Sequence, residues 1–228
     1  MAEPALPRLV VLASGRGSNY QALFRAQREG WLGGQIAAVI SDRPEAGVLD
    51  LAAADAVDAV CLDRTRFSDR HRFESTLAET IDSIDPAFVL MAGFMRVMGA
   101  SWVDHYAGRL INIHPSLLPR HRGLNTHDRA LAAGDSQHGA SVHFVVPKLD
   151  AGPVLAQVEI TIEPGDNAER LAERLLPLEH RLYPACVALL TRGIVEYRHE
   201  TIHLQGRRLS RPLLLDVDLD DRGRVDRP

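Results

Sequence analysis

The chain has 228 residues, of which 46% are hydrophobic and 25% charged, and its formal net charge at pH 7 is −4. This length and composition suit one large globular domain, and the weakly negative charge argues against a dedicated nucleic-acid-binding protein. No stretch approaches the roughly 18 uncharged apolar residues that a membrane helix needs, and residues 1–7 lack the pattern of a signal peptide. We therefore expect a cytoplasmic protein that binds neither nucleic acid nor a membrane.

The cysteines and histidines indicate no disulfide framework and no metal site. Cys61 and Cys186 lie in apolar surroundings without a paired or metal-binding spacing, so we expect two buried thiols in a reducing compartment. The ten histidines show no His-Glu-x-x-His motif or ligand cluster, and no metal is predicted.

Short, nearly continuous apolar runs alternate with helical patterns in the first half of the chain. We expect strands at residues 8–13, 36–40, 59–62 and 87–91. The first strand is followed by a helix that ends near Gly30, and further helices span about 46–54 and 69–84. Apolar strands that alternate with helices in this way are typical of a parallel sheet covered on both faces.

The second half of the chain changes character. A strand at residues 110–113 is followed by two strands, at 140–146 and 154–162, whose alternating pattern is typical of pairing across a turn. A long helix is expected at residues 167–192, and Pro177 and Pro184 should break or bend it.

A small hairpin, formed by residues 193–197 and 202–204, completes the expected elements. We predict an α/β fold with a Rossmann-like, mostly parallel sheet, helices on both faces and an antiparallel element in the C-terminal half. No linker rich in Gly, Ser or Pro separates the halves, so residues 1–215 are expected to form a single domain. Residues 216–228 alternate Asp and Arg, and we expect a charged, loosely ordered tail there.

A glycine-containing loop, Ser14-Gly-Arg-Gly-Ser-Asn19, lies where the first strand turns into a helix. Its glycines would let backbone N–H groups approach an anion, and the helix N-terminus would favour negative charge. Ser18 is a good candidate for the N-cap. The loop lacks the third glycine of a dinucleotide fingerprint and the lysine of a Walker loop. On this pattern alone, phosphate binding and a purely conformational turn are equally good interpretations.

The most informative polar residues are Asn112 and His114, which alternate with apolar neighbours before Pro115 ends the strand. Such a strand would point both side chains to one face, where they could hold an oxyanion and move a proton. Asp150, in the turn Asp-Ala-Gly-Pro, would add a carboxylate. Each residue alone has a structural explanation, as a buried histidine, a cap or a turn residue. The set together favours chemistry.

These motifs resemble those of the folate-dependent formyltransferase family. The resemblance rests on residues 112–119, 138–144 and 149–154, and it extends from about Leu9 to about Leu209. It implies formyl transfer from 10-formyltetrahydrofolate, as co-substrate, to an amine through a tetrahedral intermediate, without a metal. The Gly-x-Gly-Ser-Asn form of the loop resembles members that act on glycinamide ribonucleotide in de novo purine biosynthesis more than relatives that act on methionyl-tRNA or water.

The resemblance also implies roles for individual residues. Asn112 and His114 would stabilise the oxyanion, while Asp150 would favour the charged imidazole and help to carry the proton. The acceptor substrate would contact Gly17, Ser18, Asn19 and Glu179. The folate would contact Arg70, Met95, Arg96, Val97 and Met98. A methionine-rich core patch, a solvated arginine and an exposed helix glutamate are the competing explanations for the folate and Glu179 positions.

Alternatives within and outside the family stay open at this point. A methionyl-tRNA formyltransferase would be expected to carry a further C-terminal domain, and a formyltetrahydrofolate hydrolase a further N-terminal one. A non-catalytic nucleotide-binding module of Rossmann type would leave Asn112, His114 and Asp150 as a coincidence. Residues 120–123, Arg-His-Arg-Gly, are more basic than in many relatives, and their role is open. The substrates are expected to be small molecules, and the protein a monomer or a homodimer.

Overall fold

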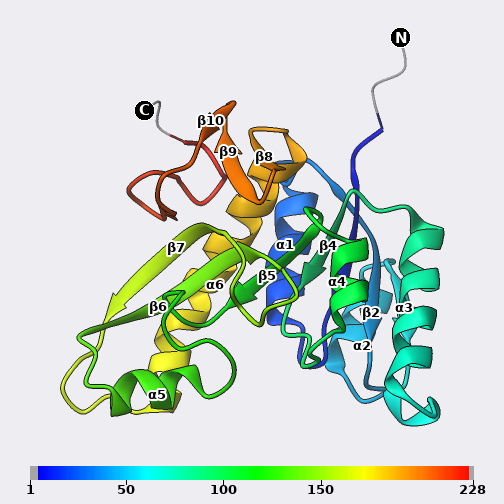
Figure 1. The fold of residues 1–228 in the computed structure, drawn as a ribbon, viewed down its shortest axis with the longest axis horizontal. Coiled ribbons are helices and arrows are strands. Elements are labelled where there is room, and N and C mark those ends of the chain that lie inside the picture. Colours follow the sequence, from blue (N-terminus) through cyan, green and yellow to red (C-terminus); the bar gives the residue numbers. More distant parts are fainter. Residues whose placement is uncertain (1–4, 226–228) are drawn as a thin grey trace.

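A computed structural model describes residues 5–225. Its centre is an eight-stranded sheet in the order β11-β7-β6-β5-β4-β1-β2-β3 (Figure 1). The parallel part comprises β1 (Arg8–Leu12), β2 (Gln35–Ser41), β3 (Asp58–Cys61), β4 (Phe88–Met91) and β5 (Leu110–His114). The sheet confirms the predicted fold class.

The C-terminal half extends this sheet with antiparallel strands. β6 (Gln137–Phe144) runs antiparallel to both β5 and β7 (Val154–Thr161), and β11 (Leu213–Leu214) pairs in parallel with β7. A separate antiparallel sheet contains β8 (Val195–Arg198), β9 (Thr201–Leu204) and β10 (Arg207–Arg208). The predicted pairing of β6 with β7 and the predicted terminal hairpin are both confirmed.

Helices cover both faces of the large sheet. α1 (Ser18–Arg28), α2 (Gly47–Ala54) and α6 (Ala168–Thr191) pack into one apolar cluster, and α3 (Arg70–Ile84) and α4 (Ala100–His105) pack into the other. In α3, Phe73, Leu77 and Ile81 are buried at a spacing of four residues, which places them on one side of the helix. A 3-10 turn (Arg64–Arg66) precedes α3, and α5 (Thr126–Ala132) lies beside α6.

Helix α6 runs unbroken through Pro177 and Pro184, so the predicted break is wrong. A proline inside a helix removes one backbone hydrogen bond and costs about 3 kcal/mol. Every residue from 182 to 190 is buried in this helix. Each buried apolar side chain contributes roughly 1.5–3 kcal/mol, which is sufficient to hold the helix together across the prolines.

The two cysteines differ in exposure, which corrects one prediction. Cys186 is buried in α6 as expected, but Cys61 is exposed. Cys61 ends β3, which lies at the edge of the sheet and has mostly exposed side chains. An apolar run at a sheet edge is covered on fewer sides than one in the sheet centre, and the sequence pattern does not distinguish the two.

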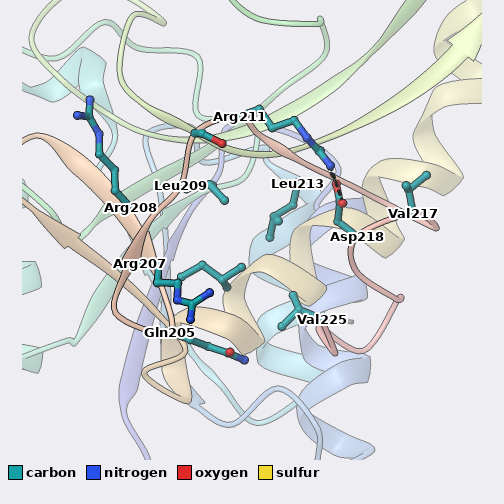
Figure 2. A pocket seen from close by; sticks show the side chains of 11 residues that line it. Gln205, Arg207, Arg208, Leu209, Arg211, Leu213, Val217, Asp218 and Val225 are labelled. Carbon is teal, nitrogen blue, oxygen red and sulfur yellow. Dashed lines mark hydrogen bonds and ion pairs between the residues drawn. The ribbon is translucent and has the colours of Figure 1, made fainter. Parts of the chain in front are cut away.

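The segment 216–225 packs against the body of the protein, contrary to the expected loose order. Leu219 is 3% exposed and belongs to the main apolar cluster. Gly223 approaches α6 so closely that a Cβ there would lie 2.4 Å from the Ala185 carbonyl oxygen. Asp218 forms a two-point ion pair with Arg211, at 2.6 and 2.8 Å (Figure 2). The last three residues of the expected tail lie outside the described residues.

Candidate active site

The predicted site residues converge at the carboxyl ends of the parallel strands, where open α/β sheets bind ligands. The glycine loop follows β1, residues 92–98 follow β4, and His114 ends β5. β1 and β5 both pair with β4. These three segments therefore lie side by side at one edge of the sheet.

The register of β5 and β6 places Asn112 directly opposite His143. The Asn112 Nδ2 and His143 Nε2 atoms are 3.1 Å apart, and His143 Nδ1 lies 3.0 Å from the Phe144 carbonyl oxygen. A carbonyl only accepts, so Nδ1 carries the proton and Nε2 accepts from the Asn112 amide. Burial lowers the pKa of His143 and keeps the ring neutral. Its 3.8 Å approach to Asp150 is therefore not an ion pair.

His143 belongs to the motif at 138–144, but the sequence analysis assigned it no role. The signal that could have identified it is its alternation with apolar Val142 and Phe144, the same pattern that selected Asn112 and His114. What the pattern could not supply is the register that pairs His143 with Asn112, because a register is set by two strands together.

His114 is nearly buried, with 9% of its side chain exposed, and it lies between two acceptors. Its Nδ1 atom is 3.6 Å from Asp150 Oδ2, and its Nε2 atom is 3.2 Å from the His121 carbonyl oxygen. Both ring nitrogens therefore face oxygen atoms, and the closer one belongs to the His121 carbonyl. The structure thus brings together the three predicted catalytic residues Asn112, His114 and Asp150.

Asp150 is held in an uncommon backbone conformation. Its φ angle is 45°, in the left-handed region, and its Oδ2 atom accepts a 2.8 Å hydrogen bond from the Gly123 backbone N–H. Such a conformation costs on the order of 1–3 kcal/mol for a residue with a Cβ, and it is found preferentially at functional sites. The hydrogen bond from Gly123 therefore holds the Asp150 carboxylate in its position beside His114.

The turn after β5 is tied to the neighbouring strands by buried hydroxyl and amide groups. The Ser141 hydroxyl donates to the Ser116 carbonyl and accepts from the Leu118 N–H, at 2.7 and 3.0 Å. The Gln157 amide bridges Leu118 and Ser141 at 3.0 and 2.9 Å. These bonds satisfy the backbone of the turn, so its position relative to β6 and β7 is fixed.

The glycine loop lies next to α6. Gly17 has a φ of 85°, and a Cβ there would lie 2.8 Å from the Val48 side chain, so both conformation and space require glycine. Gly17 is the N-cap residue of α1, which corrects the prediction for Ser18, the first helical residue. The Ser18 hydroxyl therefore does not cap the helix. It lies in the first turn of α1, where the backbone N–H groups have no partner within the helix.

Glu179 is not the solvated helix glutamate that the sequence alone suggested. The Asn19 Nδ2 atom donates to Glu179 Oε2 at 3.1 Å, across 160 residues of sequence. Burial raises the pKa of the Glu179 carboxyl, and the Asn19 hydrogen bond opposes that rise. The other amide atom, Asn19 Oδ1, is buried without a protein partner. Two predicted acceptor-binding residues therefore contact each other at the site.

The segment after β4 has two environments. Met95 and Val97 are 62% and 64% exposed, whereas Met98 is buried. The Arg70 Nη2 atom donates to the Val97 carbonyl oxygen at 2.7 Å, which places Arg70 beside the predicted folate segment. The methionine-rich core explanation therefore fits Met98 but not Met95.

A buried carboxylate that the sequence analysis missed, Asp42, anchors this segment. Its Oδ2 atom accepts from Arg96 Nε at 2.6 Å, and its Oδ1 atom accepts from the Ser14 hydroxyl at 2.5 Å. The Ser14 oxygen in turn accepts from the Met95 N–H at 2.9 Å. Asp42 follows β2 directly, and polar residues at the carboxyl end of a neighbouring strand are the signal that could have found it.

A cavity of about 620 Å³ lies elsewhere, between β10 and the C-terminal segment (Figure 2). Its lining runs from Leu204 to Val225 and contains none of the predicted site residues. The hydrogen-bonded groups at His114 therefore define the candidate site, and this cavity does not. Within residues 5–225, no helix is long and apolar enough to cross a membrane.

Comparison with known proteins agrees with this geometry. The formyl transferase family model matches residues 7–187. Phosphoribosylglycinamide formyltransferase of Escherichia coli K12 is 39% identical over 201 residues, which cover 88% of this chain and 95% of that protein. The structure of phosphoribosylglycinamide formyltransferase from Coxiella burnetii aligns with a TM-score of 0.87 at 44% identity, covering 93% of this chain and 99% of that one.

The fold is also found in a related hydrolase. A formyltetrahydrofolate deformylase from Pseudomonas putida aligns with a TM-score of 0.77 at 25% identity, covering 90% of this chain and 72% of that one. The fold therefore does not separate the two activities, but sequence identity is higher to the phosphoribosylglycinamide formyltransferases. From the extent of the family match and the agreement in fold, we conclude that the chain belongs to the formyl transferase family.

Proposed function

We propose that this protein transfers the formyl group of 10-formyltetrahydrofolate to the amine of glycinamide ribonucleotide, a step of de novo purine biosynthesis. The observation that carries the proposal is the approach of Asp150 to His114 at the end of β5, with Asn112 two residues earlier on the same strand and joined to His143, which also approaches Asp150. The phosphoribosylglycinamide formyltransferases that resemble the chain support the choice of acceptor.

The acceptor substrate binds along the glycine loop. Gly17, Ser18 and Asn19 begin α1, where free backbone N–H groups and the helix dipole favour the 5′-phosphate. Glu179, which hydrogen-bonds Asn19, receives the amino end of the substrate. The buried Asn19 Oδ1 atom, which lacks a protein partner, is available to a donor of the same substrate.

The folate binds at the segment after β4. Its ring contacts the backbone and the exposed side chains of Met95 and Val97, and the remaining predicted contacts are Arg70, Arg96 and Met98. Arg70 holds the Val97 carbonyl, and Asp42 holds Arg96. These bonds fix the segment before the folate arrives, which lowers the entropy cost of binding.

The chemistry takes place at His114. The neutral amine attacks the formyl carbon, and the oxyanion that forms accepts hydrogen bonds from Asn112 Nδ2 and from His114 Nδ1. The 3.6 Å separation of His114 Nδ1 from Asp150 exceeds a hydrogen bond, so this N–H is not committed to Asp150 and can donate to the oxyanion, while the nearby carboxylate stabilises the positive charge of the ring. A preorganised donor of this kind contributes about 3–4 kcal/mol to the transition state.

Collapse of the intermediate completes the transfer. The oxyanion re-forms the carbonyl, and the bond between the formyl carbon and the folate nitrogen breaks. The bond between the formyl carbon and the attacking amine remains as the new amide. Asp150 carries the proton, through water, from the attacking amine to the departing folate nitrogen. The products are the formylated nucleotide and tetrahydrofolate, and no covalent enzyme intermediate is formed.

An assay of formyl loss from 10-formyltetrahydrofolate, with and without glycinamide ribonucleotide, tests the proposal. We expect turnover only when the amine is present. Turnover without the amine would identify a hydrolase, and no turnover under either condition would identify a binding module. We further propose that residues 1–215 form the formyltransferase domain; a cytoplasmic location and a monomeric or homodimeric state stay predictions.

A further inference from the structure

The loop of residues 120–123 contacts both of the ionisable residues proposed for catalysis. The His121 carbonyl oxygen lies 3.2 Å from His114 Nε2, and the Gly123 N–H donates to Asp150 Oδ2 at 2.8 Å. The distance between the imidazole and the carboxylate therefore depends on where this loop lies. The loop is also the part of the motif region whose role the sequence left open.

The loop backbone needs support to keep this position. His121 has a φ of 52° and Gly123 a φ of 83°, both in the left-handed region. For a residue with a Cβ, such as His121, this conformation costs roughly 1–2 kcal/mol. The loop would leave this conformation unless other contacts stabilised it. The side-chain contacts of the loop therefore determine where the His121 carbonyl points.

Asp135 supplies that support from the segment between α5 and β6. Its carboxylate, with 5% of the side chain exposed, accepts from His121 Nε2 and from Arg120 Nη2, each at 2.6 Å. The Asp135 backbone N–H donates to the Ala130 carbonyl at 3.2 Å, which fixes the residue to the end of α5. From the other side, the Ser116 hydroxyl donates to the Arg120 carbonyl at 2.8 Å.

We propose that Asp135, acting through the His121 side chain, is a positioning residue for His114 and Asp150. It holds the His121 carbonyl against His114 Nε2, so that the ring presents Nδ1 to the reacting centre, and it holds Gly123 against Asp150. Asp135 itself touches neither substrate nor the reacting atoms. The inference rests on the proposed function, because it assigns a support for the residues named there.

Two substitutions remove the support and one retains it. Asp135→Ala deletes the carboxylate, and His121→Phe keeps a planar ring but loses the donor to Asp135. Displacement of a catalytic group by about 1 Å can lower turnover about 100-fold, so we expect kcat to fall about 10- to 100-fold in both. KM for both substrates should change by less than about threefold, since the loop orients groups that act in the transition state. His121→Gln, whose amide can still donate, should restore most of kcat.

Asp166→Asn is the matched control. Asp166 has 7% of its side chain exposed and is paired with Arg174 at 2.5 Å, and its other hydrogen bonds are with Glu163 rather than with a site residue. This variant should retain kcat even if its melting temperature falls. If Asp135→Ala does not fold, His121→Phe, which leaves Arg120 on the carboxylate, decides the question by itself.

Nitrogen-15 NMR of the His114 ring gives a readout independent of turnover. The Nε2 signal should shift in His121→Phe and stay unchanged in Asp166→Asn. Normal kcat and an unchanged His114 signal in both loop variants, with His114→Ala inactive, would overturn this inference and leave the proposed function intact. Near-normal turnover of His114→Ala would overturn the proposed mechanism instead.

Discussion

The protonation state of His143 determines which hydrogen bonds the Asn112 side-chain amide can make. His143 is neutral because burial disfavours its charged form, and its only proton is committed to the Phe144 carbonyl. Its bare Nε2 therefore accepts one of the two Asn112 amide protons, which fixes the amide with the other proton free. A charged His143 would instead repel the donor and release Asn112 from this orientation.

His114→Ala should lower kcat by about 10²- to 10⁴-fold while substrate affinity stays nearly unchanged. In the proposed mechanism the ring acts on charge that develops only in the transition state, so its loss should affect turnover rather than ground-state binding. Steady-state kinetics and calorimetric titration of each substrate measure the two effects. A variant that turns over at a near-normal rate would remove His114 from the mechanism.

Glu179→Gln should stabilise the substrate-free protein at neutral and alkaline pH. Burial raises the folded-state pKa of this carboxyl above its unfolded value of about 4.3. Its contribution to stability is thus fully present below about pH 4 and is lost as the pH rises through the folded pKa. The melting temperature of the variant should be higher than that of the parent at pH 8 and equal to it near pH 4. A variant that melts lower at pH 8 would contradict this sign.

At the level of elements, strand ends and the loops that follow them carry the site. The Ser14–Asp42–Arg96 network joins the loops after β1, β2 and β4 through one buried carboxylate. The Asn19–Glu179 bond joins the start of α1 to α6 in the same manner. Each bond links segments that belong to different elements, so the loops of the candidate site are held to one another by side-chain hydrogen bonds.

Asp42→Ala should weaken folate binding and leave acceptor binding nearly unchanged. Without the carboxylate, Arg96 and the Ser14 hydroxyl lose their shared partner, and the segment proposed to bind folate loses its anchor. Removing one member of a buried ion pair costs about 3–5 kcal/mol, of which the exposed Arg96 side chain recovers a part through solvation. Fluorescence titration with a folate analogue, alongside titration with the nucleotide, separates the two sites; equal losses would indicate general unfolding.

Ser18→Ala should have the opposite selectivity. Its hydroxyl is proposed to bind the phosphate, and a hydrogen bond to a charged group contributes about 1.5–3 kcal/mol. We expect the Kd of glycinamide ribonucleotide to rise about 10- to 100-fold and the Kd of the folate to stay within about twofold. Unchanged nucleotide affinity would show that the phosphate lies elsewhere.

At the level of the whole molecule, the C-terminal segment closes the sheet edge beside β7. β11 adds to β7, and the chain continues through the buried Leu219 to Gly223, which lies close to Ala185 of α6. Arg181 on α6 pairs with Asp216 at 2.5 Å, and Arg211 pairs with Asp218. Asp220 pairs with Arg224, so three of the aspartates that suggested a solvated tail are held in ion pairs.

Truncation after Leu215 should therefore lower the melting temperature. Loss of the buried Leu219 alone removes about 1.5–3 kcal/mol, and for a protein of this size 1 kcal/mol corresponds to about 2–4 °C. We expect a fall of about 5 °C or more, with kcat retained because residues 216–225 form no hydrogen bond or ion pair with a candidate site residue. In the full-length protein, Leu219→Ala should reproduce the effect and Val217→Ala, at an exposed position, should not. An unchanged melting temperature would restore the loose-tail prediction.

The order of the elements was largely predictable from local patterns. Continuous apolar runs identified the buried parallel strands, and the period of α3 identified its apolar face. α4 and α5, with six and seven residues, were missed because so short a helix hardly repeats its period. The continuity of α6 was mispredicted because burial of its apolar side chains outweighs the free-energy cost of its two prolines. A local sequence pattern does not contain this packing.

The sequence by itself determined the strand–helix alternation and the pairing of β6 with β7, because both follow from side-chain periodicity. It also identified Asn112, His114 and Asp150 as candidates, because their motifs follow one another in order along the chain. Tertiary structure decided the partners: His143 for Asn112, Glu179 for Asn19, Asp42 for Arg96 and Asp135 for His121. Each of these contacts joins residues at least 14 positions apart. Such contacts depend on strand order, register and burial, which arise only when the whole sheet is assembled.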